Sequence, residues 1–156
     1  AVGFAQLAMG LAQILLGALV AGIDAGRAFP TWPLMGQTFF PADAFYRPGG
    51  GAVWRAFFEN PGLVQFMHRM AGYLLAVFAL ALWLRSRRSA HPDTRQAFSL
   101  MVLMLALQIG LGIVTVLYAA PLHLGLIHQS GAVVLWVLIL RARHQSLYPN
   151  VISVRG

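Results

Sequence analysis

Four long runs of apolar residues, separated by polar segments, dominate the pattern of this chain. They cover residues 4–23, 63–84, 98–118 and 122–140. Each run is close to the roughly 20 residues that an α-helix needs to cross the hydrocarbon core of a bilayer. The pattern therefore predicts an all-α membrane protein whose four transmembrane helices form one bundle.

The segment between the first two runs, residues 24–61, is too long to be a simple connector. Pro30, Pro33 and Pro41 exclude one continuous helix through it. We expect this outer loop to lie across the mouth of the bundle. Its aromatic residues fit either a belt at the membrane interface or a lid over a bound ligand. They are Trp32, Phe39, Phe40, Trp54, Phe57 and Phe58.

The composition supports a membrane protein and orients it. Of the 156 residues 59% are hydrophobic and 10% are charged, whereas about 25% are charged in an ordinary soluble domain. The basic residues, all arginine, do not form a stripe, so no nucleic-acid surface is predicted. Six of them flank helix ends on one side, which the positive-inside rule makes cytoplasmic: Arg85, Arg87, Arg88, Arg95, Arg141 and Arg143. The chain starts at Ala1 without a methionine, so we expect a portion upstream.

Two short motifs recur in the same order along the chain. Gln13-Ile-Leu-Leu-Gly17 in the first run matches Gln108-Ile-Gly-Leu-Gly112 in the third. The second and fourth runs each carry a histidine, His68 or His128, followed at i+3 and i+4 by two small residues. Internal repetition of this kind is known in membrane proteins. It predicts a bundle built from two similar helical hairpins.

The repeat pairs His68 with His128. Both lie about six residues inside helices that run inward from the outer face, which at 1.5 Å per residue is roughly 9 Å deep. A pseudo-twofold axis between the two helices would make the imidazoles face each other. Gly72 and Gly131 lie one turn further on the same faces, where small side chains leave room for something flat.

Two opposed imidazoles suit six-coordinate haem iron, so haem b is the first candidate ligand. The chain has no cysteine, which excludes iron–sulfur clusters, cysteine-held zinc and covalently attached haem c. Zinc or copper usually takes three or four protein ligands. His123 is a candidate third ligand, although positions i and i−5 do not share a helical face. A pair of histidines satisfied by neighbours in the bundle is the structural alternative.

Other polar residues have two interpretations each. Arg69 fits either pairing with a haem propionate or snorkelling to the headgroups. Gln13 and Gln108 are expected to hydrogen-bond between helices, with a cofactor contact as the alternative. His91 and His144 lie in arginine-rich segments and are expected to be solvated.

Three stretches resemble the carboxy-terminal half of the haem A synthase family, in its alphaproteobacterial and mitochondrial form. They are GALVAGIDAGRAFPTWPLMGQTFFP, FFENPGLVQFMHRMAGYLLA and LQIGLGIVTVLYAAPLHLGLIHQSGAVVLWVLIL. The resemblance implies that the chain is the second half of a longer, eight-helix protein. Such proteins oxidise the C8 methyl of haem O to the formyl of haem A for cytochrome c oxidase.

The resemblance also implies roles for single residues. The family's carboxy-terminal half holds a haem b on two histidines, which fall on His68 and His128, and haem O binds in the other half. A glutamate implicated in the chemistry of that other half corresponds here to Gln65. Met67 stands where the family commonly has aspartate. No catalytic residue is therefore expected in this chain.

Two functions from different classes remain open. One is the haem b half of an oxidoreductase, haem A synthase. In this function the chain would contact lipid, haem O and haem A, and its candidate partners are an electron donor, haem O synthase and other copies of itself. The other is a stand-alone four-helix cytochrome b that transfers electrons without catalysis. The expected location is the bacterial inner membrane, with the mitochondrial inner membrane as the alternative.

Overall fold

The computed structural model describes residues 2–46 and 50–149. Four long helices make up most of it: α1 (Val2–Gly22), α3 (Pro61–Ser86), α4 (Pro92–Leu117) and α5 (Leu122–Leu147). The loop between α1 and α3 carries the short helices η1 (Ala25–Arg27), η2 (Val53–Arg55) and α2 (Ala56–Glu59). The described residues contain no strand, only an isolated bridge between Met35 and Thr38. The predicted all-α fold is confirmed.

All four long helices are long and apolar enough to cross a membrane. Large apolar side chains are exposed on each of them, among them Leu15, Leu74, Leu107 and Val137. Such a surface would be unfavourable in water but suits contact with lipid. The chain is therefore a multi-pass membrane protein.

All four helices extend beyond the apolar runs that predicted them, at one end or at both. Helix α3 begins at Pro61, where the side chain of Asn60 accepts a hydrogen bond from the backbone N–H of Leu63 (2.8 Å). Helix α4 begins at Pro92 rather than at residue 98, and α5 continues to Leu147 rather than ending at residue 140. Hydropathy marks the part of a helix that lies in hydrocarbon, whereas hydrogen bonding continues into polar sequence once the helix has formed. The predicted limits were wrong there for this reason.

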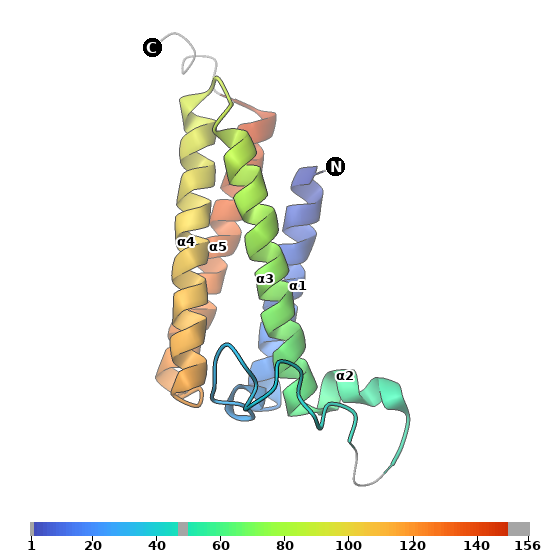
Figure 1. Ribbon diagram of the computed structural model, residues 1–156. Coiled ribbons are helices and arrows are strands. Elements are labelled where there is room, and N and C mark those ends of the chain that lie inside the picture. Colours follow the sequence, from blue (N-terminus) through green and yellow to red (C-terminus); the bar gives the residue numbers. More distant parts are fainter. Residues whose placement is uncertain (1, 47–49, 150–156) are drawn as a thin grey trace.

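The helices pack as two hairpins, α1 with α3 and α4 with α5 (Figure 1). The hairpins meet where α3 packs on α4 and where α1 packs on α5. Helices α3 and α5 therefore lie diagonally across the bundle. The start of α1, the end of α5 and the α3–α4 turn lie at the arginine-rich end, opposite the loop end that carries η1, η2 and α2.

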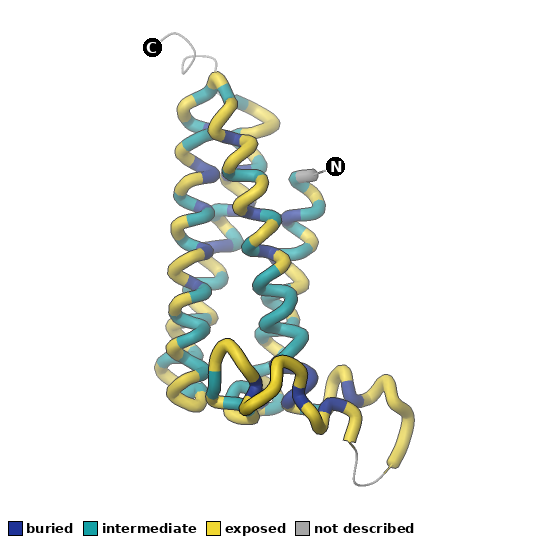
Figure 2. The backbone as a smooth tube through the Cα atoms, in the orientation of Figure 1, coloured by how far each residue is buried: buried dark blue, intermediate teal, exposed yellow. Residues whose placement is uncertain are grey.

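The closely packed core is concentrated towards the arginine-rich end. Its buried residues come from the later parts of α3 and α5 and the earlier part of α4. They are Leu75, Ala79, Ala97, Phe98, Met101, Leu105, Leu135, Ile139 and Ala142. Figure 2 shows buried positions in this half and again at the start of α3 beneath the loop, with a mainly intermediate stretch of the long helices between them. The candidate histidines belong to this intermediate stretch, nearer the loop end.

The outer loop closes the loop end of the bundle at one point. Helix η1 packs against α1, α3 and α4, and a Cβ on Gly26 would lie 2.7 Å from the Cβ of Ala120 in the α4–α5 turn. A glycine is therefore required for this close approach. The beginning of the loop thus crosses the mouth as expected, whereas α2 extends to one side of the bundle (Figure 1).

Candidate functional site

His68 and His128 approach each other in the loop half of the bundle. His68 follows the first residue of α3, Pro61, by seven positions, and His128 follows the first residue of α5, Leu122, by six. At 1.5 Å per residue, these positions are about 10 Å and 9 Å from the helix starts. The ring centroids are 6.5 Å apart and the ring planes are nearly perpendicular, at 87°. The structure thus brings together the two residues that the repeat paired.

The same two contacts between helices recur in both hairpins. A Cβ on Gly17 of α1 would lie 3.2 Å from Cε1 of His68, and a Cβ on Gly112 of α4 would lie 3.1 Å from Cε1 of His128. Such distances are tighter than an ordinary van der Waals contact, so each imidazole lies against a glycine of its own hairpin partner. Sequence reasoning did not assign Gly17 and Gly112 to the site. Their signal was present, because each ends a Q-I-x-L-G motif four residues after the glutamine.

One turn deeper, each glutamine faces the glycine that follows a histidine. A Cβ on Gly72 would lie 3.3 Å from Nε2 of Gln13, and a Cβ on Gly131 would overlap the amide of Gln108. The small residues at these positions therefore accommodate glutamine side chains. That they also admit a porphyrin stays a prediction.

Gln13 holds His68 through its side-chain amide. Its Nε2 donates to the backbone carbonyl of His68 (3.2 Å) and lies 3.2 Å and 3.3 Å from Nδ1 and Nε2 of the imidazole. An amide nitrogen has two hydrogens, so it can serve the carbonyl and one ring nitrogen together. Gln13 thus restrains the position of the ring.

The second hairpin lacks the equivalent hydrogen bond. Within the described residues, both amide atoms of buried Gln108 and Nδ1 of His128 have no hydrogen-bond partner, and neither has Oε1 of Gln13. Buried polar atoms are normally paired, and each unpaired one costs about 1–3 kcal/mol. Four of the unpaired buried atoms in the described residues thus belong to His128 and the two glutamines beside the imidazoles, and the others belong to Gln65, His91 and Gln145.

The distance between the two imidazoles is close to that of two imidazoles on one metal atom, although in this structure the Cε1 edge of each ring faces the glycine of its neighbouring helix, Gly17 or Gly112. A histidine nitrogen binds a transition metal at about 2 Å, so two such bonds in line, with the half-widths of both rings, span about 6 Å. The observed centroid separation of 6.5 Å is close to that span. No group of three or more His, Asp or Glu side chains able to hold a metal occurs among residues 2–46 and 50–149. An axial pair on haem iron matches this donor set better than a three- or four-ligand zinc site.

Arg69 and Gln65 bind the outer loop. Arg69 donates to the carbonyls of Phe29 (3.1 Å), Thr31 (2.8 Å) and, more weakly, Leu34 (3.4 Å). Gln65 Nε2 donates to the carbonyls of Gly26 and Phe29, each at 3.3 Å. These two side chains therefore fix the loop across α3. The pairing of Arg69 with a propionate stays a prediction, and the contacts that the structure shows are to the loop backbone.

Met67 packs away from the histidine pair, against a small cluster under the outer loop. The buried residues of this cluster are Ala44, Ala56 and Leu63, and Phe66 also packs against it. An apolar residue is favourable there because the cluster is apolar. The difference from the usual family residue at this position thus concerns the loop rather than the imidazoles.

The remaining histidines lie apart from the pair. His123 is exposed in the first turn of α5, and His144 is exposed with its ring 5.3 Å from that of Tyr148. His91 is half-buried at the start of α4, and its Nδ1 is buried. His91 is therefore only partly exposed to solvent, and it lies apart from the histidine pair as expected.

The family model and the relatives that match this chain belong to one family. A family model described as cytochrome oxidase assembly protein matches residues 1–140. The haem A synthases of Roseobacter denitrificans and Paracoccus denitrificans are 59% and 60% identical to the chain over 144 residues. That region is 92% of this chain and 37% of each relative, so the chain spans little more than a third of the length of these curated relatives. No solved structure gives a significant match.

Proposed function

Because the chain belongs to the cytochrome oxidase assembly protein family, with haem A synthases among its relatives, we propose that it is the haem b-binding part of a haem A synthase. The observation that carries the proposal is the pair of imidazoles, 6.5 Å apart, with unpaired buried amide atoms around it. In the intact protein this part would support oxidation of the C8 methyl of haem O to the formyl of haem A.

His68 and His128 would hold the haem b, which supplies reversible one-electron chemistry when bound. Gln13 restrains the His68 imidazole, while Gly17 and Gly112 allow both rings to lie close to the neighbouring helices. The outer loop, bound by Arg69 and Gln65, covers part of the loop end and limits access of water. The residues of this chain thus orient and shield the pair.

In our proposal, the oxidation of the haem O methyl takes place in another part of the intact protein. All four carboxylates of the sequence lie outside the spans or at their ends: Asp24, Asp43, Glu59 and Asp93. A carboxylate is the group that the resemblance implicates in methyl oxidation, and Gln65 stands at its equivalent position and binds loop carbonyls. The chain would therefore transfer electrons, and the other part of the protein would bind haem O.

Axial-ligand variants of the intact protein test this proposal. His68→Ala or His128→Ala should convert the sharp reduced α-band of a bis-histidine haem b into a high-spin spectrum that responds to carbon monoxide, because each variant opens one coordination position. His144→Ala is the matched control, since this exposed histidine lies apart from the pair, and it should leave the spectrum unchanged. An unaltered low-spin spectrum in both ligand variants would contradict the site.

A second measurement separates the enzyme from a stand-alone cytochrome b. The intact protein with both histidines should convert haem O to haem A, and His128→Ala should slow this conversion. A normal bis-histidine spectrum without any conversion of haem O would favour the electron-transfer module.

A further inference from the structure

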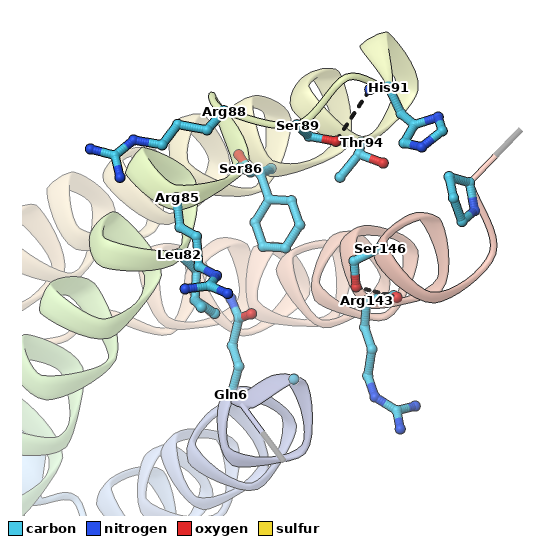
Figure 3. Close-up of a pocket in the computed structure, with 13 residues that line it drawn as sticks. Gln6, Leu82, Arg85, Ser86, Arg88, Ser89, His91, Thr94, Arg143 and Ser146 are labelled. Atoms are coloured by element: carbon cyan, nitrogen blue, oxygen red, sulfur yellow. Dashed lines mark hydrogen bonds between the residues drawn. The ribbon is translucent and has the colours of Figure 1, made fainter. Parts of the chain in front are cut away.

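A pocket of about 570 Å³ lies at the arginine-rich end, far along the helices from the histidine pair (Figure 3). It is formed where the end of α3, the α3–α4 turn and the start of α4 face the start of α1 and the end of α5. Its polar lining residues are Gln6, Arg85, Ser86, Arg88, Ser89, His91, Thr94, Arg143 and Ser146. Nothing in the proposed function uses this pocket.

The pocket is strongly basic. Arg85, Arg88 and Arg143 line it without any acidic side chain, and no salt bridge involves them in the described part of the chain. The only carboxylate of the sequence at this end, Asp93, is not among the lining residues. Arginines gathered at one concavity attract an anion, and arginine matches the geometry of phosphate oxygens well. In Figure 3 the side chains of Arg88 and Arg143 extend away from the other lining residues, so they would turn inward to bind one anion.

Three of the four hydroxyl groups of the pocket donate to backbone carbonyls, whereas that of Ser89 only accepts from the backbone N–H of His91. The arginines, His91 and the Ser89 hydroxyl are therefore among the donors left for a ligand. Ser86, Thr94 and Ser146 donate to the carbonyls of Trp83, Gln145 and Arg143. Nδ1 of His91 is buried and has no hydrogen-bond partner among the described residues. It can donate a hydrogen bond when it carries the ring proton.

Apolar side chains line the same pocket. Leu82 and Phe98 belong to the neighbouring apolar helix surfaces, and Phe98 is part of the packed core. A free phosphate ion gains nothing from such contacts, whereas an anionic phospholipid presents a phosphate to the arginines and acyl chains to the apolar surface. The pocket also lies at the end of the spans, where headgroups meet the helices.

From these observations we propose that this pocket binds the phosphate headgroup of an anionic phospholipid. Arg85 and Arg143 hold the phosphate from α3 and α5, and the ligand thereby joins the two hairpins at the arginine-rich end. The site is independent of the haem proposal, because none of its lining residues contacts the histidine pair.

Native mass spectrometry of the intact, delipidated protein in detergent tests the site. Phosphatidylglycerol and phosphatidylcholine are added separately at equal concentration, and retained lipid per protein is measured. Phosphatidylglycerol should be retained preferentially. The double variant Arg85→Gln/Arg143→Gln should weaken its retention by about fivefold for each arginine removed. Arg141→Gln is the matched control, because it removes the same charge from the same end of α5 outside the pocket.

Three results would overturn the proposal. Equal retention of both lipids would mean that the phosphate charge is not recognised. An equal loss in Arg141→Gln and Arg143→Gln single variants would mean a diffuse positive surface. Displacement of the lipid by millimolar inorganic phosphate would assign the site to a free anion. Circular dichroism of each variant shows that the helices are intact, so a loss of lipid is read as a loss of the site.

Discussion

At the scale of single residues, the two glycines that face the imidazoles leave little room for a larger side chain at the site. We expect Gly17→Leu and Gly112→Leu to displace His68 and His128, because even a Cβ would lie 3.2 Å and 3.1 Å from the rings. Haem content per protein should fall in both, and residual haem should become high-spin. Gly110→Leu is the control, since a Cβ on Gly110 of α4 meets nothing within 4 Å. Full haem content in all three variants would contradict a role for Gly17 and Gly112.

The two glutamines should differ in their effect on stability. Gln13→Met removes the hydrogen bonds to His68 and should lower the free energy of unfolding of the haem-free protein by about 0.5–1.5 kcal/mol. Gln108→Met keeps the volume but removes two unpaired buried atoms, so it should be neutral or stabilising. Thermal unfolding in detergent, followed by circular dichroism, measures both. Equal destabilisation by the two variants would mean that the Gln108 side chain makes a stabilising hydrogen bond.

Sequence reasoning could pair His68 with His128 but could not assign all their neighbours. The pairing followed from the order of the motifs, which a linear pattern can show. The contacts of Gly17 with His68 and of Gln13 with Gly72 depend on how two helices are rotated against each other, and apolar sequence on all sides of a membrane helix does not define that rotation. The loop contacts of Arg69 were missed for a related reason, because the loop has no periodicity.

At the scale of elements, the sidedness of the helix ends is the main prediction still to be tested. The chain has no cysteine, so single cysteines can be placed on an empty background. Ala90 in the α3–α4 turn and Ala42 in the outer loop are both exposed. Ala90→Cys should react with a membrane-impermeant thiol reagent only from the cytoplasmic side, and Ala42→Cys only from the opposite side.

Exposure decides which positions suit this experiment. Ser86 lies in the same arginine-rich segment but is buried, and its hydroxyl donates to the carbonyl of Trp83 (2.7 Å). A cysteine there would be protected by packing and not by the membrane. Reaction of Ala42→Cys and Ala90→Cys from one side would show that the number of spans, or their direction, is wrong.

At the scale of the whole molecule, the uneven distribution of the core predicts where bound haem stabilises the protein. The packed residues lie towards the arginine-rich end, while the histidines lie in the loop half. Ligand binding protects the region whose opening it prevents. Hydrogen exchange measured by mass spectrometry should therefore slow mainly in residues 64–72 and 125–132 when haem is added. His128→Ala should reduce this effect, and uniform slowing along all four helices would contradict it.

Each hairpin supplies one histidine, one glutamine and two glycines to the site, and it makes the contacts among them internally. The distance between the two imidazoles is therefore set by how one hairpin packs against the other. Any second hairpin that packs in the same way could supply the second histidine. A gene encoding only α1 and α3 would already carry half of the site, and self-association of its product about a twofold axis would complete it. Duplication and fusion of such a gene would keep the pair and free each copy to diverge. The two hairpins differ in the extra hydrogen bonds on the His68 side and in the turns that close them, which are the positions where such divergence would be seen.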